Sequence, residues 1–272
     1  MKGRISVIEA TQIPIKTQIR RCFKNEAAAP STQPATLRTT AVLTMMLACA
    51  TFAPSQTSEV SLRVQIHGGN RQRHKQTRDI VLSEAVVWLS PISQALSLPA
   101  RSQRNYTLAQ RNKQFTPHLL VVPTGSSVDF PNLDPFFHNV FSLFNGKRFD
   151  LGLYEAHTHR AVRFDREGVS YIFCNIHPQM GAVVIALSTP IYAISRPGGL
   201  VVLQNVPFGN YHLHIWAENV PLGQLALLER DVKIDSIDAQ LGELHLQTSG
   251  DIMDHHENKF GKDYPADPHV IY

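Results

Sequence analysis

Residues 174–180 read Cys-Asn-Ile-His-Pro-Gln-Met and bring three metal-ligating side chains into one short loop. Cys174, His177 and Met180 follow one another at intervals of three residues. Soft thiolate and thioether ligands select copper, and two histidines, one cysteine and a weak axial methionine make the copper set used for electron transfer. The loop therefore predicts a copper site that still needs one histidine from another part of the chain.

His138 is the candidate for that histidine. It stands at the start of an apolar run, in Asp-Pro-Phe-Phe-His-Asn-Val-Phe, after a loop rich in Pro and Asp. Within the cysteine loop, Pro178 restricts the backbone and Gly181 lets the chain turn back into an apolar strand. The plainer interpretation makes Cys174 and Met180 core residues and leaves the histidines as ordinary loop residues.

The first 53 of the 272 residues differ from the rest and predict a secretory leader. A basic segment leads into the apolar run 41–53, which is too short to span a bilayer and ends in small residues. Arg20-Arg21 also allows a twin-arginine route, and Cys49 a lipid anchor. We expect an exported, periplasmic protein without a membrane span in its mature chain.

Export changes how the composition is interpreted. Seven of the 26 Lys/Arg but only two of the 22 Asp/Glu lie in residues 1–53, so the remaining chain is close to neutral. That charge gives no reason to expect nucleic acid or an anionic membrane as a partner. Of the three cysteines only Cys174 is left, and a lone thiol in an oxidising compartment needs burial or a bound partner.

Beyond residue 58 the pattern is that of an all-β protein. Short blocks rich in Val, Ile and aromatic residues are bounded by Gly, Pro, Asn and Asp, and no long stretch has a helical period. The polar stretch 249–272 is expected to be a surface tail, in which the role of His255 and His256 stays open. Strands are predicted at residues 62–67, 85–89, 118–122, 127–130, 139–144, 160–164, 170–173, 182–187, 200–203 and 211–216.

Three motifs in residues 110–188 resemble the cupredoxins of the plastocyanin and amicyanin type. They are Val-Val-Pro-Thr-Gly-Ser-Ser-Val, then His-Asn-Val, then Tyr-Ile-Phe-Cys-Asn-Ile-His-Pro-Gln-Met. The short Cys-to-Met spacing is similar to that of amicyanin and of sequences named for methylamine utilisation. The resemblance implies a Greek-key β-sandwich over residues 105–189, with His138, Cys174 and His177 as strong copper ligands and Met180 as the axial one. It also implies that the side chain of Asn139 ties the two ligand loops together.

The flanking sequence resembles a second, smaller β-sandwich module. Val-Pro-Phe-Gly-Asn-Tyr-His-Leu, residues 206–213, is similar to a motif of the carboxypeptidase regulatory-like (transthyretin-like) modules. We therefore expect a discontinuous module, residues 58–98 and 190–248, into which the cupredoxin is inserted. In the alternative, the strand at 85–89 pairs within the cupredoxin instead.

The sequence thus favours a type 1 blue copper protein that carries single electrons between unidentified redox partners and is not an enzyme. One alternative is a copper enzyme with a second metal site, for which His157/His159 and His212/His214 have a suitable spacing. The other is a β-sandwich binding or structural protein whose copper site is degenerate or incidental.

Overall fold

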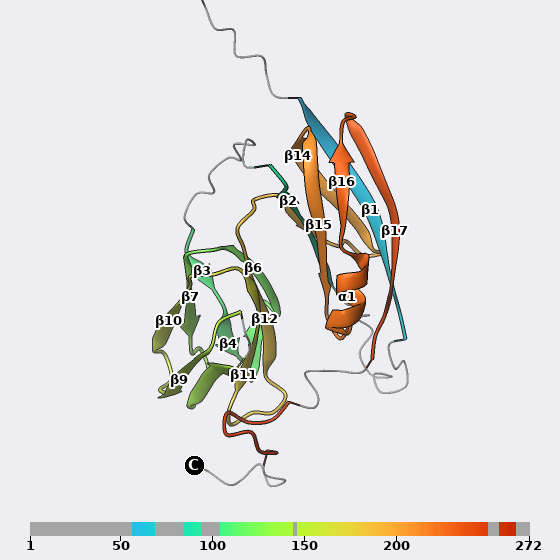
Figure 1. Ribbon diagram of the computed structural model, residues 1–272. Coiled ribbons are helices and arrows are strands. Elements are labelled where there is room, and N and C mark those ends of the chain that lie inside the picture. Colours follow the sequence, from blue (N-terminus) through green and yellow to red (C-terminus); the bar gives the residue numbers. More distant parts are fainter. Residues whose placement is uncertain (1–55, 69–83, 94–103, 144–145, 250–255, 265–272) are drawn as a thin grey trace, which may run out of the picture. The chain divides into compact units, whose positions relative to one another are not determined.

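The computed structural model describes residues 56–68, 84–93, 104–143, 146–249 and 256–264 (Figure 1). The expected leader and His255 lie outside the described residues. The described chain is almost entirely β, with strands β1 to β17 and the short helix α1. Among the described residues, no helix has the length and apolar character needed to cross a membrane.

Each of the ten predicted strand segments coincides with a strand. They are β1 (Thr57–His67), β2 (Ala85–Pro91), β6 (Leu119–Pro123), β7 (Ser126–Pro131), β8 (His138–Ser142), β10 (His159–Phe164), β11 (Gly168–Cys174), β12 (Gly181–Leu187), β14 (Leu200–Pro207) and β15 (Gly209–Ala217). The predicted segment 139–144 runs past β8, and its last residue is not among those described.

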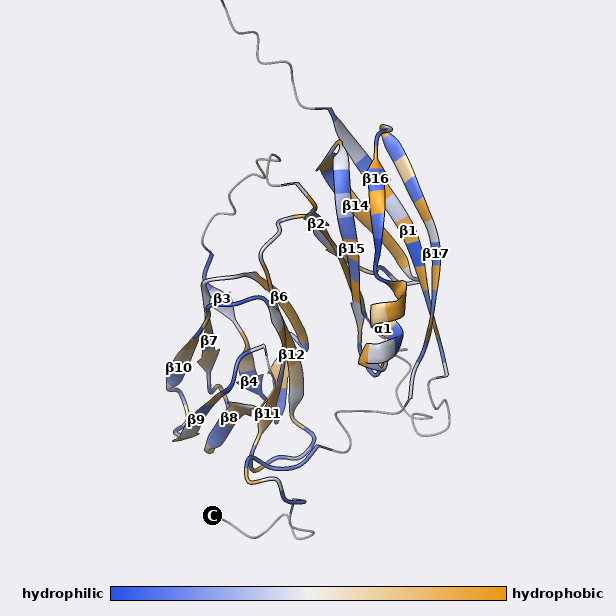
Figure 2. Ribbon diagram, viewed as in Figure 1, coloured by the Kyte–Doolittle hydropathy of each residue, from blue (hydrophilic) through white to orange (hydrophobic). Residues whose placement is uncertain are grey.

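The remaining elements were not predicted. They are β3 (Tyr106–Thr107), β4 (Ala109–Arg111), β5 (Gln114–Thr116), β9 (Phe149–Tyr154), β13 (Tyr192–Ile194), β16 (Arg230–Ile234), β17 (Asp238–Gln247) and α1 (Leu222–Leu228). Four of these strands have only two or three residues, too few to show an alternating pattern. The long strand β17 does alternate between polar and apolar residues (Figure 2), but it has no Val, Ile or aromatic residue, which are the types that marked the predicted strands.

The central strands form a five-stranded sheet, β6-β12-β11-β8-β9, and a three-stranded sheet, β10-β7-β3. One apolar cluster contains residues of both sheets, among them Phe130, Phe164 and Ile172. Strand β12 is buried on both faces, since Ala182, Val184 and Ala186 belong to this cluster while the residues between them belong to a second one. Burial on two faces explains why this strand is a continuous apolar run rather than an alternating one.

The flanking strands form two further sheets, β14-β1-β17 and β13-β2-β15-β16. Strand β1 lies between β14, to which it is antiparallel, and β17, to which it is parallel. Strand β2 is antiparallel to β13 and β15, which both follow the central part in the chain. It therefore belongs to a flanking sheet and not to the two central sheets. The two sheets thus combine strands that precede and follow the central part, as an insertion would require. The domain boundaries and the likeness to transthyretin-like modules stay predictions.

Candidate metal centre

His138 and Cys174 are brought together by strand pairing. His138 is the first residue of β8 and Cys174 the last residue of β11, and the two strands are antiparallel neighbours in the five-stranded sheet. Both residues are fully buried. Rigid strands therefore hold these side chains, which lie 36 positions apart in the chain.

The loop after Cys174 folds back on itself. The N–H of Met180 donates to the carbonyl of His177 at 3.0 Å, and the N–H of Cys174 donates to the carbonyl of Met180 at 3.3 Å. These two bonds close the turn between β11 and β12 and place His177 beside the end of β11. His177 is half-buried, whereas Pro178 and Gln179 are exposed.

Three ligand atoms converge at this point. Sγ of Cys174 lies 3.7 Å from Nδ1 of His138 and 3.6 Å from Nδ1 of His177, and the two Nδ1 atoms are 3.1 Å apart. A first-row cation bound to nitrogen at about 2.0–2.1 Å and to sulfur at about 2.3 Å in tetrahedral geometry holds its ligand atoms roughly 3.3–3.6 Å apart. The residues present therefore fit a single small cation.

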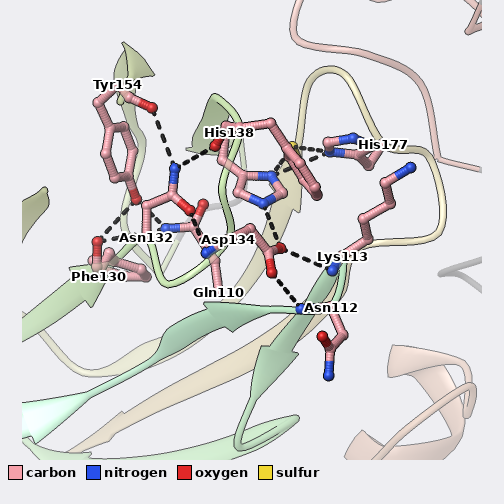
Figure 3. Close-up of polar contacts among 11 residues, drawn as sticks. Gln110, Asn112, Lys113, Phe130, Asn132, Asp134, His138, Tyr154 and His177 are labelled. Atoms are coloured by element: carbon pink, nitrogen blue, oxygen red, sulfur yellow. Dashed lines mark hydrogen bonds and ion pairs between the residues drawn. The ribbon is translucent and has the colours of Figure 1, made fainter. Parts of the chain in front are cut away.

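Asp134 determines which nitrogen of His138 faces the centre. Its Oδ2 lies 2.8 Å from Nε2 of His138, and the two side chains are 4% and 0% exposed (Figure 3). A carboxylate only accepts hydrogen bonds, so Nε2 carries the proton and the Nδ1 lone pair of the neutral imidazole points towards Cys174. Metal-binding histidines typically donate their second nitrogen in this way.

The electrostatics keep both imidazoles ready for a metal. Burial lowers the pKa of His138, and the contact with Asp134 offsets only part of that effect. Burial, together with the neighbouring His138 and Lys113, lowers the pKa of His177 to about 4. Burial also raises the pKa of Cys174. At neutral pH the two histidines therefore present lone pairs, while the thiol gives up its proton only when a cation replaces it.

Met180 is fully buried and belongs to the same apolar cluster as Cys174. The backbone bonds of the loop fix its position after His177. A buried thioether in the same apolar cluster as the thiol is compatible with a weak axial ligand. The axial role itself stays a prediction.

Asn139 acts differently from what the resemblance implied. Its Nδ2 donates to Oδ1 of Asp150 on β9 at 2.7 Å, and its buried Oδ1 has no hydrogen-bond partner among the described residues. The contact with Cys174 comes from the backbone of Asn139, whose N–H bonds to the thiol and opposes the rise of its pKa. The side chain thus links β8 to β9 instead of tying the two ligand loops together.

Asp134 is the residue near the centre that the sequence did not single out. Besides His138, it accepts the backbone N–H groups of Asn112 at 2.6 Å and Lys113 at 2.9 Å. Burial alone would raise its pKa, but these bonds outweigh burial and lower it. A carboxyl four residues before the histidine was visible in the sequence, although nothing there showed that the turn between β4 and β5 would also bind it.

A second set of polar residues supports the loop that carries Asp134. Asn132 donates from Nδ2 to the carbonyl of Phe136 at 2.7 Å, and its Oδ1 accepts the N–H of Asp134 at 3.0 Å. The hydroxyl of Tyr154 donates to the carbonyl of Phe130 at 2.9 Å and also contacts Gln110 (Figure 3). These contacts fix the approach of the chain to His138.

The described part of the tail, residues 256–264, contacts the cysteine loop. The hydroxyl of Tyr264 donates to the carbonyl of Cys174 at 2.8 Å, and the N–H of Lys259 donates to Oδ1 of Asn175 at 3.0 Å. The ring of His256 stacks on Phe173 with 3.9 Å between centroids. The tail therefore supports the cysteine loop, a role that the polar composition of the tail did not predict.

The other singled-out histidines lie elsewhere. His159 opens β10 and contacts Asp129 at 2.7 Å in an exposed position, while His157 lies in the preceding turn with φ 60°, outside the strand. His212 and His214 both lie on β15 and belong to a different cluster. None of the four takes part in the group of His138, Cys174 and His177.

Comparison with known proteins gave matches to solved structures alone. No protein-family model matches this chain, and no curated protein does either. A purple cupredoxin from Nitrosopumilus maritimus is 23% identical over 30% of this chain and 100% of its own, with a TM-score of 0.28. A reduced amicyanin mutant is 17% identical over 37% of this chain and 98% of its own, with a TM-score of 0.30.

A third match is a copper-containing nitrite reductase from Thermus scotoductus. It is 20% identical over 36% of this chain but only 25% of its own length, with a TM-score of 0.30. Because the identities and TM-scores are this low, we base the function on the geometry of the site alone.

Proposed function

We propose that the protein is an exported type 1 copper protein that carries single electrons between redox partners. The observation that supports this most directly is the convergence of Nδ1 of His138, Sγ of Cys174 and Nδ1 of His177 within 3.1–3.7 Å of one another. Two imidazoles and a thiolate, with the buried thioether of Met180 in the same apolar cluster as the thiolate, are a soft donor set that selects copper over magnesium or calcium.

A bound copper ion would supply one-electron exchange between Cu(I) and Cu(II). The chain's own contribution is rigidity. His138 is fixed by β8 and Asp134, and Cys174 by β11 and the tail hydroxyl of Tyr264. Ligands held this firmly move little when the charge at the centre changes, so little reorganisation opposes electron transfer.

His177 is the proposed route for the electron. It is the only one of the three clustered ligands that is not fully buried, and exposed Pro178 and Gln179 follow it. Phe136 packs against its ring with 5.6 Å between centroids, and Phe137, next in the chain, is 52% exposed. A weakly polar surface of this kind would suit brief contact with a redox protein, whose identity stays open.

Loading the purified full chain with Cu(II) tests the proposal. We expect one copper per chain at this centre, an intense visible absorption from the copper–thiolate bond, and reversible one-electron reduction. Cys174→Ser should remove the absorption and the redox response, whereas Met180→Leu should keep the colour and shift the potential. A colourless wild-type protein would exclude type 1 copper.

The rival enzyme function requires a second centre at which substrate could bind. The described residues contain one other group of clustered metal-ligating side chains, His212, His214 and Glu229, which shares no residue with the group of His138, Cys174 and His177. We propose a carrier and not an enzyme, because two imidazoles and a thiolate are the donor set of copper centres that transfer electrons. Assaying the copper-loaded protein for nitrite reduction would test the rival directly, and turnover would overturn the proposed role.

A further inference from the structure

Strands β15 and β16 bring together a second set of metal-ligating side chains. His212 and His214 are two positions apart on β15, so they project from the same face of the sheet. In the antiparallel pairing with β16, His212 lies opposite Asp231 and Leu213 opposite Arg230. Glu229 directly precedes β16 and comes next to His214.

The distances within this set are those of a convergent site. Nδ1 of His214 lies 3.2 Å from Oε1 of Glu229, to which it donates a hydrogen bond when no metal is bound, and Nε2 of His212 lies 3.8 Å from Oε2 of the same carboxylate. A bound cation would take the place of the hydrogen on Nδ1 of His214. One ligand atom from each of the three residues falls within 4.8 Å of the others. All three side chains are partly exposed, which leaves room for an ion to enter from solvent.

Asp231 orients His212. Its Oδ1 lies 2.7 Å from Nδ1 of His212, and because a carboxylate accepts, that nitrogen carries the proton when the imidazole is neutral. The Nε2 lone pair then faces Glu229, so two acceptors point towards each other across 3.8 Å. A cation between them would satisfy both, and a carboxylate behind a ligating histidine is the usual support of such sites.

His214 is oriented from its other side. Its ring stacks on Trp88 of β2, with 5.1 Å between centroids and 11° between planes, and the two residues are cross-strand partners. Stacking against this mostly buried indole restricts rotation of the imidazole. Contacts within the chain thus fix the orientation of both histidines before any metal binds. Two histidines that served only as solvated surface residues would not need such contacts.

We propose that His212, His214 and Glu229 bind a zinc ion, with Asp231 as the residue that positions His212. Two imidazole nitrogens and one carboxylate oxygen are a ligand set that zinc accepts, and the absence of sulfur distinguishes this site from the soft set around Cys174. The ion would link β15 to the start of β16. This inference does not depend on whether the other centre takes copper.

Titration with zinc tests the proposal. The full chain is used in two forms, the Cys174→Ser variant and the copper-loaded wild type. Calorimetry and metal analysis should give one zinc per chain in both proteins. His212→Gln and His214→Gln should abolish that binding, and Asp231→Asn should weaken it by about 10- to 100-fold. Because these side chains are partly exposed, circular dichroism should show that the variants fold.

His159→Gln is the matched control, since exposed His159 also contacts a carboxylate, that of Asp129 at 2.7 Å, but belongs to neither group of clustered metal-ligating side chains among the described residues. It should leave zinc affinity unchanged. Failure of copper-loaded wild type to bind zinc more tightly than roughly millimolar would overturn the proposal. So would equal zinc affinity in the copper-loaded wild type, His212→Gln and Glu229→Gln. Neither result would bear on the colour of the copper centre.

Discussion

Asp134→Asn changes one buried oxygen beside the proposed copper ligand His138. In the wild type, Oδ2 accepts from Nε2 of His138 and from the N–H of Lys113, while Oδ1 accepts from the N–H of Asn112. An asparagine has one acceptor and one donor group in place of two acceptors. It therefore cannot satisfy all three donors in either orientation of its amide.

The two orientations have different costs. If the amide oxygen faces His138, its NH₂ group opposes the N–H of Asn112, and a buried donor without a partner costs about 1–3 kcal/mol of folding free energy. If the NH₂ group faces His138 instead, the imidazole must carry its proton on Nδ1, which removes the lone pair that points at the metal. Copper affinity should then fall about 10- to 100-fold, which corresponds to about 1.4–2.7 kcal/mol.

Two measurements separate these effects. Competition with a chelator of known affinity gives the Cu(I) dissociation constant, and urea unfolding of the copper-free protein gives its stability. Asp129→Asn is the control, because Asp129 accepts from the exposed His159 at 2.7 Å and its replacement should change stability by less than about 0.5 kcal/mol. Equal copper affinity together with equal unfolding free energy in the two variants would refute the assignment of Asp134 as the residue that orients His138, because each orientation of the amide changes one of the two quantities.

Three further predictions concern the same centre. Copper binding at pH 7 should release about one proton, because burial raises the pKa of Cys174 while the histidines are already neutral. Calorimetry in buffers of different ionisation enthalpy measures the number of protons released. Copper binding to Cys174→Ser should release none. Tyr264→Phe removes the bond to the carbonyl of Cys174 and should cost about 0.5–1.5 kcal/mol and speed copper loss to a chelator, whereas Phe260→Leu, at an exposed tail position, should change neither. The copper-free protein should lose stability as the pH falls from about 6.5 towards 4, since the unfolded His177 takes up a proton in this range and the folded one, with its pKa lowered to about 4, does not. His177→Gln should reduce the slope of urea-derived stability over that window, and the lowered pKa of His138 should leave a remainder. An unchanged slope would contradict the assigned pKa of His177.

The sequence by itself determined the features of the protein that depend on residues close together in the chain. The interval Cys-x-x-His-x-x-Met lies within one loop, so the closeness of Cys174 and His177 follows from chain length alone. Alternating and continuous apolar runs likewise predicted ten strands, since the period of a strand is a local property. The choice of His138 as the distant member also came from the sequence, and strand pairing does bring it to Cys174.

Only the tertiary structure determined the polar contacts between residues that are far apart in the chain. Asp134 gains its role because the β4–β5 turn and His138 meet at its two oxygens, and Glu229 reaches His214 because β16 pairs with β15. Tyr264 contacts Cys174 across 90 positions of the chain. Such contacts leave no periodic trace in a sequence, because each is a single short-range bond whose partners are set by the packing of whole sheets. The sequence thus names the proposed ligands, and the fold determines which groups orient them.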